Sequence, residues 1–484
     1  MSALPLIIKN KKIKERKFTV KKIIISILLV LTLCLNVVAL SSCGGNSSSA
    51  ADFEIPEEGF DTETPVTITF YHTMGASLRA VLDTYIEKFN ELYPNITVQH
   101  EQAGSYDDVR DKIKTEITVG NQPNIAYCYP DHVALYNLAK APVTLDNLIA
   151  DEELGLTEEQ IADFIEGYYN EGKAFGDDKM YTMPLSKSTE VLYYNKTFFE
   201  KHNLKVPTTW EEMEETCKKI KELEPKSIPL GYDSESNWFI TMCEQYGSPY
   251  TSATGDHFLF DNEKNHDFVK KFRDWYQKGY VTTEQISGGY TSSLFTKADG
   301  EEGKSYMTIG SSAGASYQRP QKGSDGKYPF EVGITGVPQV DKANPKVISQ
   351  GPSLCIFNKS NPQEVIASWL FVKFLTTNVD FQAEFSQTSG YMPVIKSVQK
   401  NENYKTYFLD KADGGDNITA LSVKVGFENE KAYYTSPAFN GSSVARDEVG
   451  KLMQECFVAK TDNVDNTIKK AFEDALATCE FKAG

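Results

Sequence analysis

The fold is decided by the stretch Val66-Thr67-Ile68-Thr69-Phe70-Tyr71, followed by an amphipathic segment at 78–92 and by Asn95-Ile96-Thr97-Val98. The two short runs are rich in β-branched and aromatic residues, which is typical of strands, and the segment between them has the apolar spacing of a helix. This order of strand, helix and strand predicts a βαβ unit, in which two parallel strands are joined by a crossover helix.

The same alternation continues further along the chain. A second helix is expected at 106–119 and another strand at 124–129. Repeated βαβ units predict an α/β fold built on mostly parallel sheets flanked by helices. Ligands of such sheets bind beyond the carboxyl ends of the strands. By this rule, His72 and Asp131 are candidate ligand-binding residues, because each follows directly on a predicted strand.

The length of the chain, 484 residues, predicts two lobes rather than one small module. A second group of elements begins with the strand Val191-Leu192-Tyr193-Tyr194-Asn195. Helices are expected after it, at 209–223, 238–245 and 266–278, and strands return at 305–309 and 353–357. No repeat of 20 to 50 residues is visible in the sequence, so a solenoid is not indicated.

The charge distribution argues against a nucleic-acid partner. The chain has a formal net charge of −17, and residues 1–42 hold eight Lys and Arg with one acid, so the remainder is more acidic than the whole. No basic patch is available to neutralise a phosphate backbone.

The first forty-odd residues have the pattern of an export signal. Eight basic residues precede a largely apolar run at 23–40. The run is also long enough to serve as a permanent membrane anchor. It ends in Leu40-Ser41-Ser42-Cys43-Gly44-Gly45, which resembles the bacterial lipobox. We therefore expect a signal peptide at 1–42, lipid on Cys43, and a flexible tether at 43–64, which is rich in Gly, Ser and acids.

Six cysteines remain in the mature chain, and no two of them form a C-x-x-C pair, so a zinc ribbon is not indicated. Cys456 and Cys479 are the pair to test for a disulfide. Buried free thiols are the alternative reading.

Three segments resemble a known family: Phe89-Asn90-Glu91-Leu92-Tyr93-Pro94-Asn95-Ile96, Leu192-Tyr193-Tyr194-Asn195-Lys196, and Ser389-Gly390-Tyr391-Met392-Pro393-Val394. The chain is similar, from about residue 66 to 457, to extracellular solute-binding proteins of the carbohydrate-uptake type (family 1), which are receptor subunits of ABC importers. The resemblance implies a periplasmic-binding-protein-like fold with two α/β lobes and a ligand cleft between them. It places crossing strands near 186–193, 305–309 and 351–357. The implied lobes are 65–185 plus 304–350, and 186–303 plus 351–484.

Within this family the chain most resembles the receptors for sn-glycerol 3-phosphate and its diesters. The matching stretches are Phe70-Tyr71-His72-Thr73-Met74, Ser188-Thr189-Glu190-Val191-Leu192-Tyr193-Tyr194-Asn195-Lys196, Met307-Thr308-Ile309-Gly310-Ser311-Ser312-Ala313-Gly314, and Gln350-Gly351-Pro352-Ser353-Leu354. Carried over position by position, the ligand contacts of these receptors fall on Tyr106, Ser188, Ser311, Gly351, Tyr391 and Arg446. The chain departs from the pattern at Pro130, where these receptors have a cleft glutamate, and the adjacent Asp131 can take over its role.

The implied contacts form a chemically coherent set. Arg446 can offer a planar pair of donors to a phosphate, while Ser188, Ser311 and the Gly351 amide supply neutral donors. The rings of Tyr106 and Tyr391 suit a sugar as well as a glycerol. Each residue also has an ordinary structural reading: Ser311 as a helix N-cap, the tyrosines as core residues, and Arg446 as a solvated side chain.

Enzyme chemistry is poorly supported. The segment Gly310-Ser311-Ser312-Ala313-Gly314 matches the G-x-S-x-G nucleophile motif, but all six histidines precede Ser312, whereas that hydrolase fold places its histidine afterwards. No motif singles out a pair of catalytic carboxylates, and none has metal-ligand spacing. We therefore expect no catalytic residues, no metal and no cofactor.

Taken together, the sequence predicts a monomeric substrate-binding lipoprotein on the outer face of a bacterial cell membrane. It would capture sn-glycerol 3-phosphate, a glycerophosphodiester or a sugar, and deliver it to the transmembrane subunits of an ABC permease. Two alternatives stay open: an oligosaccharide-specific receptor of the same family, and an exported glycoside-processing enzyme.

Overall fold

The computed structural model describes residues 51–483, so the expected signal peptide and Cys43 lie outside the described residues. Within 51–483, none of the helices combines the length and apolar character that crossing a bilayer requires. The described part of the expected tether is not free, which corrects the prediction of a tether at 43–64. Residues Ala51–Asp52 (β1) pair with Val143–Thr144 (β5). The next residue, Phe53, is apolar within an otherwise polar segment, and its side chain is buried in the core.

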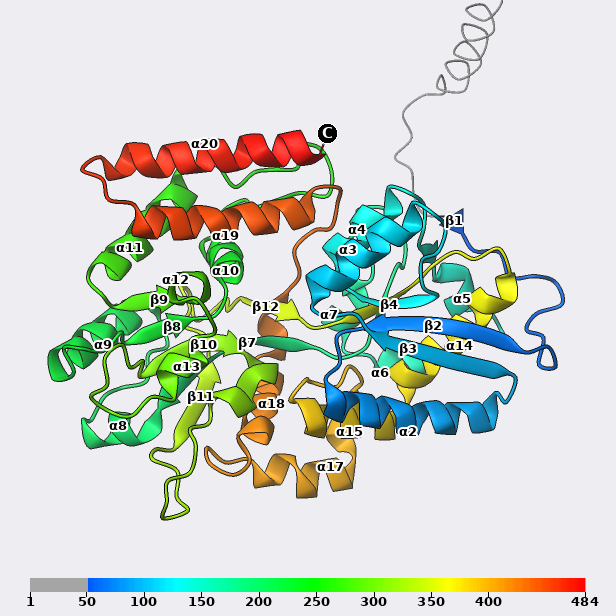
Figure 1. Cartoon of the computed structure of the whole chain (residues 1–484), viewed down its shortest axis with the longest axis horizontal. Coiled ribbons are helices and arrows are strands. Elements are labelled where there is room, and N and C mark those ends of the chain that lie inside the picture. Colours follow the sequence, from blue (N-terminus) through cyan, green and yellow to red (C-terminus); the bar gives the residue numbers. More distant parts are fainter. Residues whose placement is uncertain (1–50, 484) are drawn as a thin grey trace, which may run out of the picture. The chain divides into compact units, whose positions relative to one another are not determined.

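The first sheet has the strand order β3-β2-β4-β13-β6. Its strands β3, β2 and β4 are labelled in Figure 1. Its strands are β3 (Ile96–Gln102), β2 (Val66–His72), β4 (Ile125–Cys128), β13 (Ser353–Ile356) and β6 (Met183–Pro184). The pairs β2–β3 and β2–β4 are parallel, as the βαβ pattern predicts. Strand β13 runs antiparallel to β4 and β6. The strand before it in the chain, β12 (Val347–Gln350), belongs to the second sheet.

The helices of this sheet are either amphipathic, like α2 (Ala76–Leu92), or buried along most of their length, like α14 (Pro362–Thr377). In α2 the buried residues Val81, Leu82, Tyr85 and Phe89 recur at helical spacing and join the core around the sheet. Helix α3 (Tyr106–Ile117) starts at a capping box of Ser105 and Asp108, so its first residue is fixed. Helices α14 and α15 (Val379–Ser389) complete this core.

The second sheet has the strand order β14-β12-β7-β10-β8-β9, and β11 (Val332–Gly336) also pairs with β7. Its strands are β14 (Tyr433–Tyr434), β12 (Val347–Gln350), β7 (Ser188–Asn195), β10 (Met307–Ser311), β8 (Leu230–Tyr232) and β9 (Val281–Thr283). Strands β10, β8 and β9 are parallel to one another. Helices α9 (Trp210–Leu223), α10 (Glu235–Tyr246), α11 (Glu263–Gln277), α19 (Ser442–Val458) and α20 (Val464–Ala483) contribute to its core.

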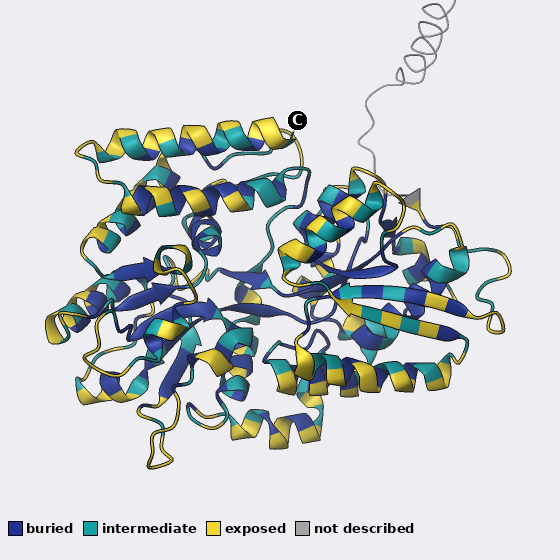
Figure 2. Cartoon of the chain, viewed as in Figure 1, coloured by how far each residue is buried: buried dark blue, intermediate teal, exposed yellow. Residues whose placement is uncertain are grey.

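Each sheet therefore has its own core, and we name two lobes accordingly. The first lobe comprises 51–186 and 352–412, and the second lobe comprises 187–351 and 413–483. In Figure 2 buried residues follow the strands and the inner faces of the helices, while the outer faces of the helices are exposed. The cysteines in the described part of the chain are buried and carry free thiols, including Cys456 and Cys479.

The lobe boundaries differ from those expected. Strand β10 pairs with β7 and β8, so the segment 304–350 belongs to the second lobe. Strand β13 pairs with β4 and β6, so the chain after 351 first returns to the first lobe. The expected crossing at 305–309 is wrong, because β9 and β10 share a sheet. The chain crosses between the lobes at 186–187 and at 351–352. It crosses a third time after α17 (Glu402–Tyr407) and before α18 (Ile418–Glu428), which packs on β7 and β11. A strand pattern identifies a strand without specifying the sheet that it joins.

Candidate functional site

A cavity lies where residues of the two lobes meet, and its volume is about 590 Å³ including the solvent at its mouth. The first lobe contributes the start of α4 (Pro130–Asn137) and the end of α7 (Glu166–Glu171). The second lobe contributes β12, the start of α19 and the loop that precedes it. The lining residues are Tyr129, Pro130, Asp131, Glu171, Ile240, Tyr250, Ile348, Ser349, Gln350, Thr435, Ser436, Pro437, Ser442 and Arg446.

Arg446 is the cationic residue of this lining, and α10 fixes it at two points. The hydroxyl of Ser236 donates to the backbone carbonyl of Arg446 at 2.8 Å. The guanidinium of Arg446 donates from Nη2 to Oδ1 of Asn237, a neutral amide rather than a carboxylate. A guanidinium has five N–H donors. Arg446 therefore has further N–H donors for the cavity.

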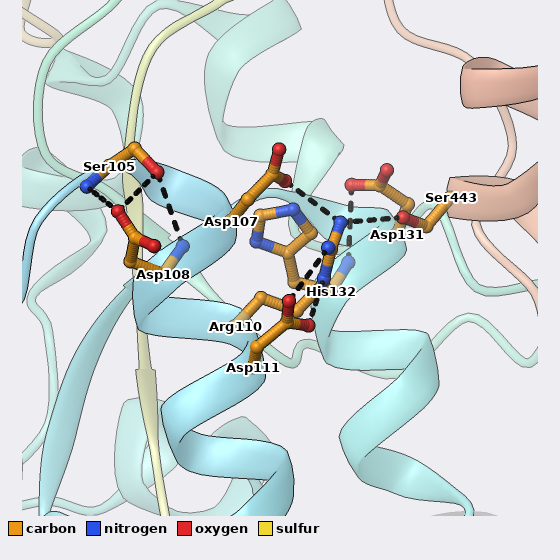
Figure 3. A network of polar contacts seen from close by, with 8 residues as sticks. All are labelled: Ser105, Asp107, Asp108, Arg110, Asp111, Asp131, His132 and Ser443. Atoms are coloured by element: carbon orange, nitrogen blue, oxygen red, sulfur yellow. Dashed lines mark hydrogen bonds and ion pairs between the residues drawn. The ribbon is translucent and has the colours of Figure 1, made fainter.

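Asp131 lies in the first turn of α4, at the position that the strand-end rule selected. Its carboxylate accepts a hydrogen bond from the amide of His132 at 3.1 Å (Figure 3). Beside it, Arg110 of α3 binds Asp107 at 2.8 Å and donates to the hydroxyl of Ser443 on α19 at 3.3 Å. This last contact joins the first lobe to the second at the edge of the cavity.

Three cavity hydroxyls are buried without a hydrogen-bond partner: those of Tyr250, Ser349 and Ser436. Unpaired buried polar groups cost free energy, and native structures satisfy nearly all of them. Three such groups around one cavity are therefore donors or acceptors that a ligand can satisfy. Sequence reasoning missed all three residues, although Ser349 directly precedes the quoted segment at 350–354.

Ser188 and Gly351 lie side by side where the chain passes between the lobes, since Ser188 is the register partner of Gln350. Gly351 has φ +99°, and a Cβ atom there would lie 2.5 Å from the carbonyl oxygen of Ser186. Only glycine fits this passage, because the backbone conformation and the space both exclude a side chain. Ser188 is 3% exposed and belongs to the wall rather than to the lining of the cavity.

Lys187 and Glu171 form an ion pair that is buried at this same passage, with side chains 0% and 3% exposed. The ammonium of Lys187 also donates to Ser353 Oγ at 3.0 Å and to the carbonyl of Gly351 at 3.3 Å. The hydroxyl of Thr435 donates to the other oxygen of Glu171 at 3.2 Å. The ammonium of Lys187 is therefore paired with groups of the protein itself rather than directed at a ligand.

Ser311 ends β10, and its hydroxyl accepts a hydrogen bond from the amide of Ala313 at 3.2 Å. This is the N-cap reading of the residue, at the start of the 3-10 helix Ser312–Gln318 (η1). Capping uses only an acceptor position of this hydroxyl, and Ser311 is not among the residues that line the cavity. Ser312, the serine of the G-x-S-x-G match, is fully buried and accepts a bond from the amide of Thr189 at 3.1 Å.

Tyr106 and Tyr391 are brought together, with their hydroxyl oxygens 3.5 Å apart. The ring of Tyr106 stacks on that of Tyr129, a cavity residue, with centroids 4.6 Å apart. Burial raises the pKa of Tyr106 and of Tyr391, so both hydroxyls stay protonated at neutral pH and can donate. The two tyrosines thus lie behind the cavity wall and contact it through Tyr129.

The structure gives His72 a different role from the expected one. It is fully buried, its Nδ1 accepts from the amide of Met74 at 3.1 Å, and its Nε2 lies 2.8 Å from Nδ1 of His100. Burial lowers the pKa of His72 to about 3, so the ring is neutral. His72 is not among the residues that line the cavity, and these contacts stabilise the end of β2 instead.

Glu190 is a second residue that sequence reasoning passed over. It is 2% exposed on β7, opposite Ser311 of β10. Tyr232 donates to one carboxylate oxygen at 2.5 Å and Asn237 to the other at 2.9 Å. Burial raises the pKa of Glu190 to about 7, although both hydrogen bonds oppose that shift. A charged residue inside an apolar strand was the signal that could have identified it.

Among the described residues, no group of three or more His, Cys, Asp or Glu side chains has the arrangement of a metal site. The lining of the cavity combines one cation, Arg446, with two carboxylates, Asp131 and Glu171, and with buried hydroxyls and aromatic rings, a combination suited to a small polar molecule.

Comparisons with known proteins identify the family of the chain. A family described as bacterial extracellular solute-binding protein matches residues 84–409. The sn-glycerol-3-phosphate-binding periplasmic protein UgpB of Salmonella typhimurium is 26% identical over 369 residues, which are 73% of this chain and 80% of that protein. The protein of the same name from Escherichia coli is 24% identical over 373 residues, or 74% of this chain and 81% of that one.

Two solved structures show the same fold. The structure of UgpB from Mycobacterium tuberculosis in complex with glycerophosphocholine has a TM-score of 0.69 at 17% identity, covering 86% of this chain and 99% of that one. The ABC substrate-binding protein Lmo0181 from Listeria monocytogenes, in complex with cycloalternan, has a TM-score of 0.67 at 18% identity, covering 86% of this chain and 100% of that one. The expected two-lobed α/β fold is thereby confirmed. With the family matching more than half of its length, the chain belongs to the bacterial extracellular solute-binding proteins, the substrate-binding components of ABC importers.

Proposed function

We propose that the cavity captures a phosphate ester of glycerol, either sn-glycerol 3-phosphate or a glycerophosphodiester. The observation that carries this proposal is the position of Arg446, whose guanidinium is held by a neutral amide at a cavity with three unpartnered hydroxyls. An anion bound there would gain a charge-assisted bond from Arg446 and neutral bonds from Tyr250, Ser349 and Ser436.

Of the six residues carried over from the family, Arg446 lines the cavity, and the other five would act from positions outside its lining. Arg446 would contact the phosphate, and Gly351 and Ser188 would form the floor at the passage between the lobes. Tyr106 and Tyr391 would support the ligand indirectly, through the ring of Tyr129 that lines the cavity. Ser311, on β10, would have to reach the ligand from outside the lining. Asp131, at the cavity edge, would accept a glycerol hydroxyl in place of the glutamate that the family has at Pro130. The names of the curated relatives support this ligand class.

An oligosaccharide is the second candidate ligand, and a specific feature of the lining favours it. Asp131, Glu171, Tyr129 and Tyr250 all face the cavity, and carboxylates with aromatic rings are suited to the hydroxyls and C–H faces of a sugar. An anionic ligand must instead overcome the acidity of the chain as a whole, so the local field of Arg446 has to dominate.

The protein would act by binding and delivery rather than by catalysis. Ligand held between the two lobes would stabilise a closed form through contacts that each lobe makes only when the other is near. That form would be presented as a monomer to the transmembrane subunits of the permease. Lipid on Cys43 would keep the protein at the outer face of the membrane. Incorporation of a labelled fatty acid tests this, because the wild-type protein should be labelled and Cys43→Ser should not.

The decisive experiment is isothermal titration of the purified protein with glycerol 3-phosphate, a glycerophosphodiester and a panel of neutral oligosaccharides. We expect saturable binding of a phosphate ester that Arg446→Ala abolishes. Saturable binding of an oligosaccharide alone would reject the phosphate ligand and keep the receptor. Hydrolysis products in the recovered samples would instead support the exported glycoside-processing enzyme.

A further inference from the structure

We propose that Asn237 is the positioning residue for Arg446, and that Glu190 couples the protonation state of the protein to the charge of the bound ligand. The inference rests on the proposed function, because it concerns how the same cavity recognises an anion. It adds two buried residues that do not line the cavity and that act through Arg446.

Asn237 is held so that its side-chain amide has one orientation. It is 3% exposed near the start of α10, where its backbone amide donates to the capping hydroxyl of Ser234 at 3.2 Å. Its Oδ1 accepts from Arg446 and from Gln350 Nε2, the latter at 3.2 Å. Its Nδ2 donates to Gln350 Oε1 at 3.0 Å and to Glu190 Oε1 at 2.9 Å. Both hydrogen-bonding ends of the amide are occupied.

The carboxylate of Glu190 decides which end of that amide faces Arg446. An ionised carboxylate only accepts hydrogen bonds, so it requires the NH₂ end of Asn237. The oxygen end is then turned to Arg446, which only donates. Gln350, itself a lining residue, pairs with both ends of the same amide and so connects the network to the cavity surface.

The charges around Glu190 make this network sensitive to an anion. The titratable groups that face it are Tyr232 on β8, Asp233 after β8, Tyr434 on β14 and Arg446 on α19. Arg446 is the cation in this set. When a phosphate binds Arg446, the attraction between the guanidinium and Glu190 is opposed by the new negative charge. The ionised form of Glu190 then becomes less favourable, and its affinity for a proton rises.

The sign of the effect follows from linkage. Burial already places the pKa of Glu190 near 7, and a bound anion would raise it further. Protons are therefore taken up on binding near pH 7. Affinity for the anion is therefore highest below the pKa of the free protein, and it falls to a lower plateau as pH rises from that value to the raised pKa of the complex. A neutral ligand does not share this dependence.

The first test is titration of the purified protein with glycerophosphoglycerol, a diester whose charge does not change near neutral pH. For a shift of about one pKa unit, from near 7 to near 8, we expect affinity about fivefold higher at pH 6 than at pH 8. We also expect proton uptake at pH 7, measured as the dependence of the binding heat on the ionisation enthalpy of the buffer. Glu190→Gln should keep binding and abolish both effects. Glu284→Gln is the matched control, because burial also raises the pKa of Glu284 to about 7.

The positioning role is tested with Asn237→Ala, which we expect to weaken diester binding by at least about tenfold. Asn265→Ala is the matched control, since Asn265 is a fully buried amide of the same lobe that donates to the backbone of Phe260 and Pro249. It should lower stability without changing affinity. Equal affinities for Asn237→Ala and wild type, or a flat pH dependence of diester binding in wild type, would overturn the inference.

A ligand-free measurement separates this inference from the identity of the ligand. The ¹⁵N resonances of the Arg446 side chain, assigned by their loss in Arg446→Lys, should titrate with a midpoint near pH 7 in the free protein and stay constant in Glu190→Gln. Failure of the phosphate to bind, with this titration present, would reject the proposed ligand alone. Absence of the titration would reject the coupling itself.

Discussion

Lys187 and Arg446 are two cations beside one cavity, and the fold treats them in opposite ways. Lys187 is fully buried and ion-paired with Glu171, and its other bonds go to a serine hydroxyl and a backbone carbonyl. Arg446 is half-buried, lines the cavity, and donates to the neutral amide of Asn237. The first charge is neutralised by a direct ion pair inside the protein, while the second makes no direct ion pair with the described residues and lies at the surface of the cavity.

The difference teaches how to distinguish a cation that holds a structure together from one that binds a ligand. A buried charge is tolerated when an opposite charge and additional hydrogen bonds satisfy it, so Lys187 belongs to the joint between the lobes. A neutral partner orients a guanidinium without cancelling its field. Stability should therefore depend on Lys187, and ligand affinity on Arg446.

The largest expected effect is on stability, from Lys187→Met. This change leaves the carboxylate of Glu171 buried without its cation, and we expect the free energy of unfolding to fall by about 3–5 kcal/mol. Urea denaturation followed by circular dichroism measures it. The double change Lys187→Met with Glu171→Leu should recover most of the loss, because no buried charge is then left unpaired. A loss below about 1 kcal/mol for the single change would mean that this pair does not hold the joint.

Arg446→Ala should give the reverse pattern. We expect affinity for a phosphate ester to fall by about 2–5 kcal/mol, because the anion loses its charge-assisted partner, while the free energy of unfolding changes by less than about 1 kcal/mol. Titration calorimetry and urea denaturation measure the two quantities. Arg273→Ala is the control, since this arginine lies on α11 and donates to the carbonyl of Ala459. An affinity loss smaller than tenfold for Arg446→Ala would remove it from the site.

The sequence predicted the individual helices and strands well, but it predicted poorly which lobe each strand belongs to. The run at 66–98 predicted β2, α2 and β3, because side-chain periodicity is a local property. The run at 305–309 was correctly read as a strand and wrongly taken as a crossing, since pairing with β7 and β8 depends on contacts far away in the sequence.

The site shows the same limit. Arg446 and Asp131 line the cavity, and their positions were available from a resemblance and from the strand-end rule. Asn237 and Glu190 carry no motif, and their importance follows only from partners brought together by folding: Arg446, Gln350 and Tyr232. His72 satisfied the strand-end rule, but burial and the contact with His100 gave it a structural role.

Glu190 extends the comparison of Lys187 with Arg446 to an acid. It is buried, and its hydrogen bonds come from the neutral groups of Tyr232 and Asn237 rather than from a cation. Its pKa in the folded protein is about 7, above its usual value, so the folded state holds a proton that the unfolded state has released between about pH 4.5 and 7. Stability from this group is present at low pH and is lost as pH rises through about 7. We expect Glu190→Gln to be more stable than wild type by about 1–3 kcal/mol at pH 8, and the two to be similar at pH 5. Thermal unfolding across this pH range measures the difference, and identical curves at both pH values would contradict the prediction.

The smallest expected effect comes from an ion pair of the same chemical type in a different environment. Lys270 of α11 and Asp465 of α20 are bridged on the surface, with side chains 53% and 77% exposed. Water already solvates both groups, so Lys270→Ala should change the free energy of unfolding by less than about 1 kcal/mol, and 1 M salt should abolish even that difference. Salt should leave the effect of Lys187→Met almost unchanged, because its pair is shielded from solvent. If urea denaturation gave the two lysine changes equal costs and equal salt dependence, burial would not explain the role of Lys187. The different roles assigned to Lys187 and Arg446 would then follow only from their positions, since Arg446 lines the cavity and Lys187 does not.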